Sequence, residues 1–284
     1  MRALPSIRLG SHTVSRLIVG GNPVSGNSHI SREANREMRD YFSAANVKKL
    51  LSSCEKAGIN TWLSRGDAHI LRLLNEYRLE GGRIQWIAQT APELADVPRH
   101  IRALAAAKPI GIYHQAGQSD NFFKAGKMEV VRERCALIRE TGVLVGIGTH
   151  TPEVIDYVES KAWDFDFYMA CVYNIHNTSH MNRTKEEREV LAGHQLDREL
   201  FWDPDREKML ARVRQTKKPC LIFKVYGASR KCGSPEQMLE ALRLVARYAK
   251  STDAVVIGMF PKHKEQVNEN CRLLMQAVAS EGAA

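Results

Sequence analysis

Two histidines lie at the ends of apolar runs that have the length and composition of buried strands. His114 lies near the end of the run 109–115, and His150 ends the run 144–150. An imidazole titrates near neutral pH, so it can transfer a proton or bind a divalent metal ion. If the runs are neighbouring parallel strands, both rings face one pocket, and hydrogen-bonded core histidines are the alternative. Possible further metal ligands are Cys171, His176, His180 and Asp67.

A lysine interrupts another apolar run. Lys224 lies within the run 219–227, where a charged side chain is costly unless it faces a polar site. Its amine could be a base, a Schiff-base nucleophile or an anion clamp, and a structural or cofactor-contact role is the alternative. Tyr226 follows two residues later on the same face of a strand and is a candidate proton donor.

Polar side chains at the other strand ends are candidates for holding a substrate. They are Asn22, Arg65, Asp67, Gln89, Tyr173, Asn174 and His176. Arg230 and Lys262 follow the last two predicted strands, where barrels often bind phosphate. Ordinary exposed basic loops are the alternative interpretation of these two residues.

The elements that would position these side chains alternate along the whole chain. Helical periodicity separates eight apolar runs, and this alternation predicts a single (β/α)₈ TIM barrel domain over 1–284. Strands are expected at 15–21, 59–65, 84–90, 109–115, 144–150, 165–173, 219–227 and 254–261. Helices are expected at 44–57, 68–79, 97–107, 128–141, 152–161, 204–216, 235–249 and 263–279. Thr151-Pro152, Asp203-Pro204 and Ser234-Pro235 place a cap residue and a proline at three helix starts.

Three segments lie outside this alternation. Residues 7–14 alternate apolar and polar types around Gly10-Ser11, which predicts a β-hairpin that could close the floor of the barrel. The long connections 22–43 and 174–203 follow predicted strands and therefore belong to the catalytic face. Because 174–203 is rich in hydrogen-bonding side chains, we expect a lid over a polar, sugar-like substrate there.

Composition excludes several classes of protein. The formal charge of +9 is spread over helix faces together with acidic residues, which favours a solvated surface over nucleic-acid binding and leaves an anionic small molecule as a partner. The six cysteines lack C-x-x-C spacing, so neither a disulfide framework nor structural zinc is expected. Without a membrane-length apolar run or a signal peptide, the chain is expected in the cytoplasm.

Four strings of residues resemble the aldo/keto reductase superfamily. They are Arg8-Leu9-Gly10 and the segments 15–21, 145–153 and 265–270. The resemblance implies the same barrel fold, with Gln266 and Asn270 in the segment that binds the adenosine end of NADP. The catalytic aspartate, tyrosine, lysine and histidine of the family are missing, and Asn60 occupies the position matched to the aspartate.

We therefore expect a reductase-like barrel that performs acid and base chemistry of the lyase, isomerase or epimerase type. The substrate would be a polar, sugar-like or anionic small molecule, and the cofactor would be a divalent metal or NADP. One alternative is an NADP-dependent oxidoreductase with other catalytic residues. The second alternative is a noncatalytic ligand-binding barrel. The sequence does not predict the oligomeric state.

Overall fold

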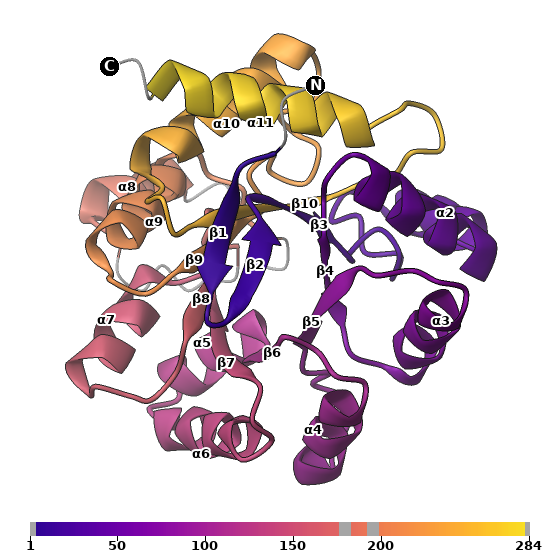
Figure 1. Ribbon diagram of the computed structural model, residues 1–284. Coiled ribbons are helices and arrows are strands. Elements are labelled where there is room, and N and C mark those ends of the chain that lie inside the picture. The colour runs from indigo at the N-terminus through magenta and orange to yellow at the C-terminus, as the bar shows by residue number, and fades with distance from the viewer. Residues whose placement is uncertain (1–3, 176–182, 192–198, 282–284) are drawn as a thin grey trace.

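Eight parallel strands close into a barrel in the order β10-β3-β4-β5-β6-β7-β8-β9. The computed structural model describes residues 4–175, 183–191 and 199–281. The barrel strands are β3 (Leu17–Gly20), β4 (Thr61–Arg65), β5 (Gln85–Gln89), β6 (Gly111–His114), β7 (Leu144–Thr149), β8 (Phe167–Cys171), β9 (Cys220–Phe223) and β10 (Ala254–Gly258). Each lies inside its predicted range, so the (β/α)₈ prediction is confirmed (Figure 1).

The helices that surround the barrel also follow the predicted order. They are α2 (Ala44–Lys56), α3 (Ala68–Leu79), α4 (Val97–Ala106), α6 (Met128–Arg139), α7 (Pro152–Ser160), α9 (Pro204–Gln215), α10 (Pro235–Tyr248) and α11 (Val267–Glu281). Proline occupies the start of α7, α9 and α10 as expected, but of their cap residues only Ser234 makes a side-chain cap hydrogen bond. Among the described residues, no helix has the length and apolar character needed to cross a membrane.

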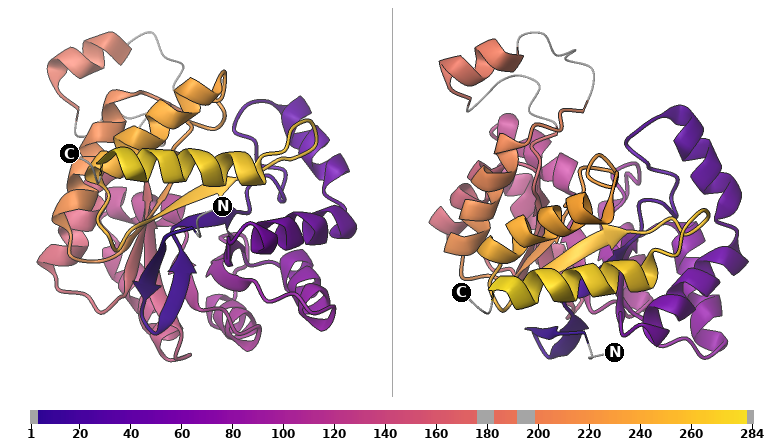
Figure 2. Two further views of the ribbon diagram at one scale, coloured as in Figure 1. Left: turned by 45° about the horizontal axis from the view of Figure 1, so that its top comes forward. Right: turned by 90° about the horizontal axis from the view of Figure 1, so that it is seen from above.

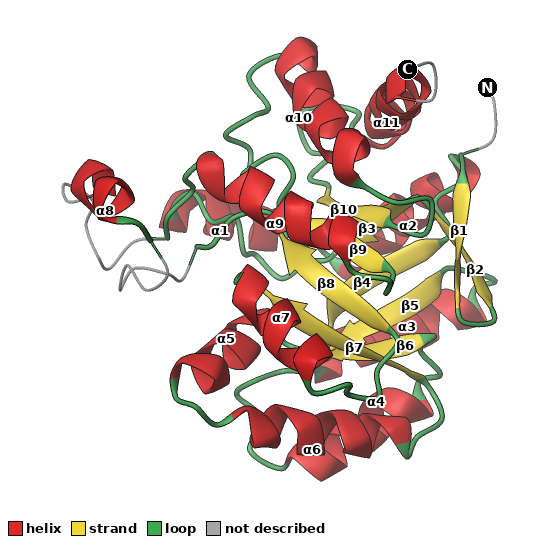
Figure 3. Cartoon of the chain, turned by 90° about the vertical axis from the view of Figure 1, so that its left-hand side faces the viewer, coloured by secondary structure: helices red, strands yellow, loops and turns green. Residues whose placement is uncertain are grey.

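Three helices within the connections were missed. They are α1 (Arg32–Tyr41), α5 (Ala116–Lys124) and α8 (Lys185–Leu191), and each follows a barrel strand. In two of the views, α8 projects away from the barrel wall (Figures 2 and 3). Of the predicted lid 174–203, residues 176–182 and 192–198 lie outside the described residues, and His176 and His180 are among them.

The predicted hairpin closes the floor of the barrel. Strands β1 (Ser6–Leu9) and β2 (His12–Ser15) pair antiparallel and bury Ile7, Leu9 and Val14 against the barrel interior. Asn60 at the amino end of β4 accepts a hydrogen bond from the Ser15 amide at 2.8 Å. Figure 3 places the hairpin at the end of the barrel opposite α8. Asn60 therefore supports the floor, and its match to a catalytic aspartate was wrong.

Strand alternation decides which side chains enter the barrel. Tyr113 of β6 belongs to the interior cluster with Leu63 and Met169, whereas its neighbour Ile112 packs in the outer cluster beneath the helices. In β7 the interior position beside Tyr113 is Gly146, where an added Cβ would lie 2.4 Å from the ring of Phe167. The register therefore turns His114 toward the helices and brings His150 to the mouth of the barrel.

Candidate active site

Three adjacent strands end in one layer at the mouth of the barrel. Thr149 pairs with Ala170, so the next residues, His150 and Cys171, lie side by side, and Cys171 pairs with Phe223 across β8 and β9. The rings of His150 and Phe223 meet edge to face with centroids 5.6 Å apart. The side chain of His150 forms a hydrogen bond with the Cys171 thiol. The carboxyl ends of β7, β8 and β9 thus contribute an imidazole, a thiol and an aromatic wall.

A buried aspartate from α5 fixes His150. Asp120 is 1% exposed, and its carboxylate accepts hydrogen bonds from the Thr149 hydroxyl at 2.6 Å and from the His150 Nδ1 at 2.7 Å. The same carboxylate accepts the His150 backbone amide at 3.1 Å. A carboxylate that binds one ring nitrogen fixes the orientation and the tautomer of a histidine. Asp120, Thr149, His150 and Cys171 therefore form a connected polar network inside an apolar barrel.

This network sets the charge of His150. Burial alone lowers the pKa of an imidazole. Here the interactions of the ring with Cys171 and Asp120 outweigh burial, and they raise the pKa of His150 to about 9. The ring is consequently protonated at neutral pH and can donate a proton.

Lys224 lies directly beyond this layer, but not on a strand. Strand β9 ends at Phe223, and Lys224 has a φ of +60°, which L residues rarely adopt. Its Nζ is buried and has no hydrogen-bond partner in the described parts of the chain. Burial is the main cause that lowers the pKa of Lys224, and the charge of Arg230 lowers it further. Cys171 and Glu199 have the opposite effect but do not outweigh burial. Lys224 therefore presents an amine that is more readily uncharged than an exposed lysine.

The early end of β9 corrects the expectation for Tyr226. Because the chain turns after Phe223, with the Gly227 amide donating to the Lys224 carbonyl at 2.7 Å, strand alternation does not place Tyr226 beside Lys224. The Tyr226 hydroxyl donates to the Asn270 Oδ1 at 2.8 Å in a buried contact, and burial raises its pKa. Tyr226 therefore fastens the β9–α10 connection to α11 instead of standing as a free proton donor.

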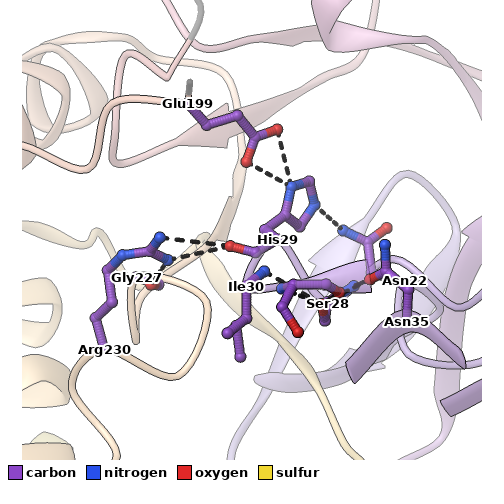
Figure 4. Close-up of polar contacts among 9 residues, drawn as sticks. Asn22, Ser28, His29, Ile30, Asn35, Glu199, Gly227 and Arg230 are labelled. Atoms are coloured by element: carbon purple, nitrogen blue, oxygen red, sulfur yellow. Dashed lines mark hydrogen bonds and ion pairs between the residues drawn. The ribbon is translucent and has the colours of Figure 1, made fainter. Parts of the chain in front are cut away.

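His29 joins three segments beside the mouth (Figure 4). Its Nδ1 contacts the Glu199 carboxylate at 2.7 Å, and its Nε2 lies 3.2 Å from the Asn22 Nδ2. The Arg230 guanidinium donates to the His29 carbonyl at 3.4 Å. Burial lowers the pKa of His29, and the charges of Lys224 and His150 lower it further. Glu199 raises this pKa but does not outweigh the other causes. The β3–α1 connection and residue Glu199 therefore lie close enough to Lys224 and His150 for their charges to interact.

A cavity of about 90 Å³ opens beside His150. Its lining is His150, Pro152, Glu153, Asn174, Arg183, Asp205 and Lys208. The guanidinium of Arg183 binds both oxygens of Asp205 at 2.9 and 3.0 Å, and this pair is buried. Burial raises the pKa of Glu153, which adds a carboxyl group that binds a proton more readily. Asn174 is thus the predicted substrate residue that shares a cavity with His150.

Four other predicted substrate residues, Arg65, Asp67, Gln89 and Tyr173, have partners within the protein. Arg65 forms ion pairs with Asp67 and Glu93, and Asp67 also caps α3. Gln89 accepts the Tyr113 hydroxyl at 2.7 Å, and Tyr173 donates to Asp203 at 3.0 Å. Each of these side chains therefore has at least one partner within the protein.

His114 does not join His150, which corrects the prediction that both rings face one pocket. The Arg134 guanidinium lies 3.2 Å from the His114 Nε2, and the His114 Nδ1 lies 2.8 Å from the Ser119 hydroxyl. Arginine can only donate, so Nε2 is the acceptor and Nδ1 carries the proton. Burial and Arg134 lower the pKa of His114 to about 3. His114 is therefore a neutral residue of the helix layer, and the two histidines do not form a metal pair.

The predicted cofactor residues also have internal partners. Gln266 Oε1 accepts the Phe260 amide at 2.7 Å, Asn270 is held by Tyr226, and Lys262 forms an ion pair with Glu37 at 2.8 Å. Arg230 donates to the carbonyls of His29 and Gly227. Within the described residues, no group of three or more His, Cys, Asp or Glu side chains could hold a metal ion.

Known proteins match this chain in structure alone. No known family model matches it, and no curated protein sequence does. A truncated 3-deoxy-D-arabino-heptulosonate 7-phosphate synthase from Thermotoga maritima is 11% identical over 99% of this chain and 92% of its own, with a TM-score of 0.51. An N-acetylmannosamine-6-phosphate 2-epimerase from Clostridium perfringens is 16% identical over 85% of both chains, with a TM-score of 0.48.

A glycerol dehydrogenase, AKR11B4 from Gluconobacter oxydans, is 15% identical over 98% of this chain and 95% of its own, with a TM-score of 0.47. The match to the synthase, with a TM-score above 0.5, agrees with the barrel fold, and an identity this low does not choose among barrel families. Membership of the aldo/keto reductases therefore stays a prediction.

Proposed function

We propose that this chain is a barrel enzyme that transfers protons to and from a small polar molecule, with His150 as the acid. The observation that carries the proposal is the Asp120–His150–Cys171 network at the carboxyl ends of adjacent strands, where barrel enzymes perform their chemistry. A buried imidazolium supported by a carboxylate can give a proton to a leaving or carbonyl oxygen, and the neutral ring can then take one from carbon. Lyases, isomerases and epimerases share these two steps.

The cavity beside His150 supports a polar substrate. Asn174 offers an amide, and Arg183 and Lys208 offer positive charge that Asp205 and Glu187 partly balance. A hydroxylated or anionic small molecule would find hydrogen-bond donors there.

Deuterium exchange tests this proposal without a known substrate. Sugars, sugar phosphates, hydroxy acids and keto acids would be incubated with the protein in D₂O, and mass spectrometry would detect exchange of a carbon-bound proton. We expect exchange into one class of compound, about 100-fold slower or more in His150→Gln. His69→Gln is the matched control, because His69 is an exposed histidine of α3. The rate should fall as the pH rises through about 9, where His150 loses its proton.

A second candidate, a noncatalytic ligand-binding barrel, is favoured by the internal pairing of Arg65, Gln89 and Tyr173. Compounds that raise the melting temperature but never exchange would support that candidate. Exchange that is unaffected by His150→Gln would exclude His150 as the acid. Gln266 and Asn270 use their side chains inside the protein, so NADP-dependent reduction is not proposed.

A further inference from the structure

The Lys224 amine is a buried polar group at the barrel mouth to which the acid chemistry of His150 gives no role. Its Nζ is shielded from solvent and has no hydrogen-bond partner in the described parts of the chain. Leaving a buried ammonium unpaired is costly, because no acceptor replaces the water it has lost. A ligand atom or a covalent bond to a ligand would remove that cost.

Lys224 has a backbone conformation that is unfavourable in free energy. Lys224 has a φ of +60°, and left-handed geometry costs an L residue about 1–2 kcal/mol. Strained positions of this kind cluster where a side chain must be aimed at a ligand. The turn closed by the Gly227 amide and the Lys224 carbonyl follows directly on β9, so the amine is aimed from a rigid strand end.

The surroundings favour an uncharged amine over an anion clamp. The Lys224 Nζ lies over the Phe201 ring at 5.5 Å from its centroid, and the guanidinium of Arg230 covers the same ring at 3.8 Å. Burial disfavours a positive charge on Lys224, and the neighbouring permanent cation of Arg230 acts in the same direction. A clamp for an anion would need the charged form, whereas a nucleophile needs the free lone pair.

The groups needed to handle protons lie next to it. Phe223, the residue before Lys224, packs its ring on His150 and pairs with Cys171 in the sheet. Lys224 and Cys171 are also close enough for their charges to interact. Amine, thiol and imidazole thus follow one another at the carboxyl ends of β9, β8 and β7.

We propose that Lys224 forms an imine with the carbonyl carbon of an aldehyde or ketone substrate. This inference rests on the proposed function and names its substrate class. The amine adds to the carbonyl carbon, its nitrogen loses one proton to water and the alkoxide oxygen takes one from water, which gives a neutral carbinolamine that keeps one hydrogen on nitrogen. His150 then protonates the hydroxyl, which leaves as water, and the product is a protonated imine. The carbon–oxygen bond breaks as the carbon–nitrogen double bond forms. The neutral His150 then takes a proton from the adjacent carbon, which gives an enamine.

Reductive trapping tests the proposal on the intact wild-type protein. Hydroxyacetone, dihydroxyacetone or pyruvate would be added with sodium cyanoborohydride, which reduces an imine to a stable amine, and peptide mapping would locate the adduct. We expect Lys224 to be labelled by at least one probe about tenfold faster than Lys49, an exposed lysine of α2. Lys224→Arg should abolish the fast labelling, and Lys49→Arg should preserve it.

Because labelling is mapped on the wild-type protein, the result stands even if the Lys224 variant folds poorly. Labelling of Lys224 no faster than Lys49 with all three probes would overturn the proposal. His150-dependent deuterium exchange without a Lys224 adduct would overturn the imine alone and leave the proposed function standing. A Lys224 adduct without exchange would support the imine and contradict the proton-transfer function.

Discussion

His114 and His150 lie at the ends of neighbouring strands and are both buried, yet one ring is neutral and the other is protonated. They are 1% and 4% exposed. Ser119 and Arg134 contact the first ring, and Asp120 and Cys171 contact the second. The pKa is lowered to about 3 for His114 and raised to about 9 for His150.

The difference shows that burial does not decide the charge of a histidine; its partners do. Desolvation lowers the pKa of both rings. Arg134 adds to this effect at His114, whereas Cys171 and Asp120 reverse it at His150. Strand alternation creates the two environments, because it turns one ring to the helices and the other to the barrel mouth.

Removing Asp120 should have the largest effect on this comparison. Asp120→Ala removes the carboxylate that pairs with the buried His150 imidazolium and accepts the Thr149 hydroxyl, and breaking a buried ion pair costs about 3–5 kcal/mol. Urea denaturation at pH 7 measures the change. Asp120→Asn keeps the shape but removes the negative charge, so the pKa of His150 in NMR titration should fall steeply.

Asp164→Asn is the matched control for that experiment. Asp164 forms an ion pair with Arg139 but is 80% exposed, so its loss should cost less than about 1 kcal/mol. If Asp120→Ala lowered the free energy of unfolding no more than Asp164→Asn does, the conclusion that His150 is protonated would be wrong.

Lowering the pH should have an intermediate effect, which is a loss of folding free energy caused by His114. Between pH 6.5 and about 3 the unfolded chain protonates its histidine while folded His114 stays neutral, so stability falls as the pH falls. From pH 6.5 to 5 this amounts to about 1.6 kcal/mol, because the full slope of about 1.36 kcal/mol for each pH unit is reached only below pH 6.5. Urea denaturation of the wild type and of His114→Gln at both pH values measures the difference.

His150 should behave with the opposite sign. Its folded pKa is raised, so its stabilisation is complete below about pH 6.5 and is lost as the pH rises toward about 9. His150→Gln should therefore differ most from the wild type at low pH, and His114→Gln least. Parallel pH profiles for the two variants would show that the rings share one charge state.

The sequence predicted the barrel because its evidence repeats. Each strand has its own apolar run, and each helix–strand connection has its own turn residues. An error at one position, such as the predicted end of β9, therefore does not change the predicted fold. The hairpin was predicted from the alternation of apolar and polar residues at 7–14 and from the turn residues Gly10-Ser11. His150 and Lys224 could be selected because charged or titratable side chains near apolar strand ends are costly without a purpose.

The partners of these residues could not be predicted from periodicity. Helix α5 buries Ala116, Ser119 and Asp120, so its inner face has no apolar stripe for a periodicity analysis to detect. Asp120 was therefore missed, and Cys171 was considered only as a metal ligand. His29 and Glu199 lie in segments whose contacts span 170 residues of sequence, which no local pattern reports.

The smallest effect should come from the residue beside Asp120. Ser119→Ala removes the hydroxyl that contacts the His114 Nδ1, and losing one such hydrogen bond costs about 1 kcal/mol. Thermal or urea denaturation measures it, and NMR should show an unchanged His150 titration. Ser119 and Asp120 are consecutive residues of α5, so one helix supports both rings through adjacent side chains. A shift of the His150 pKa in Ser119→Ala would mean that the two environments are coupled through α5, and the contrast between them would then belong to the helix instead of to each partner separately.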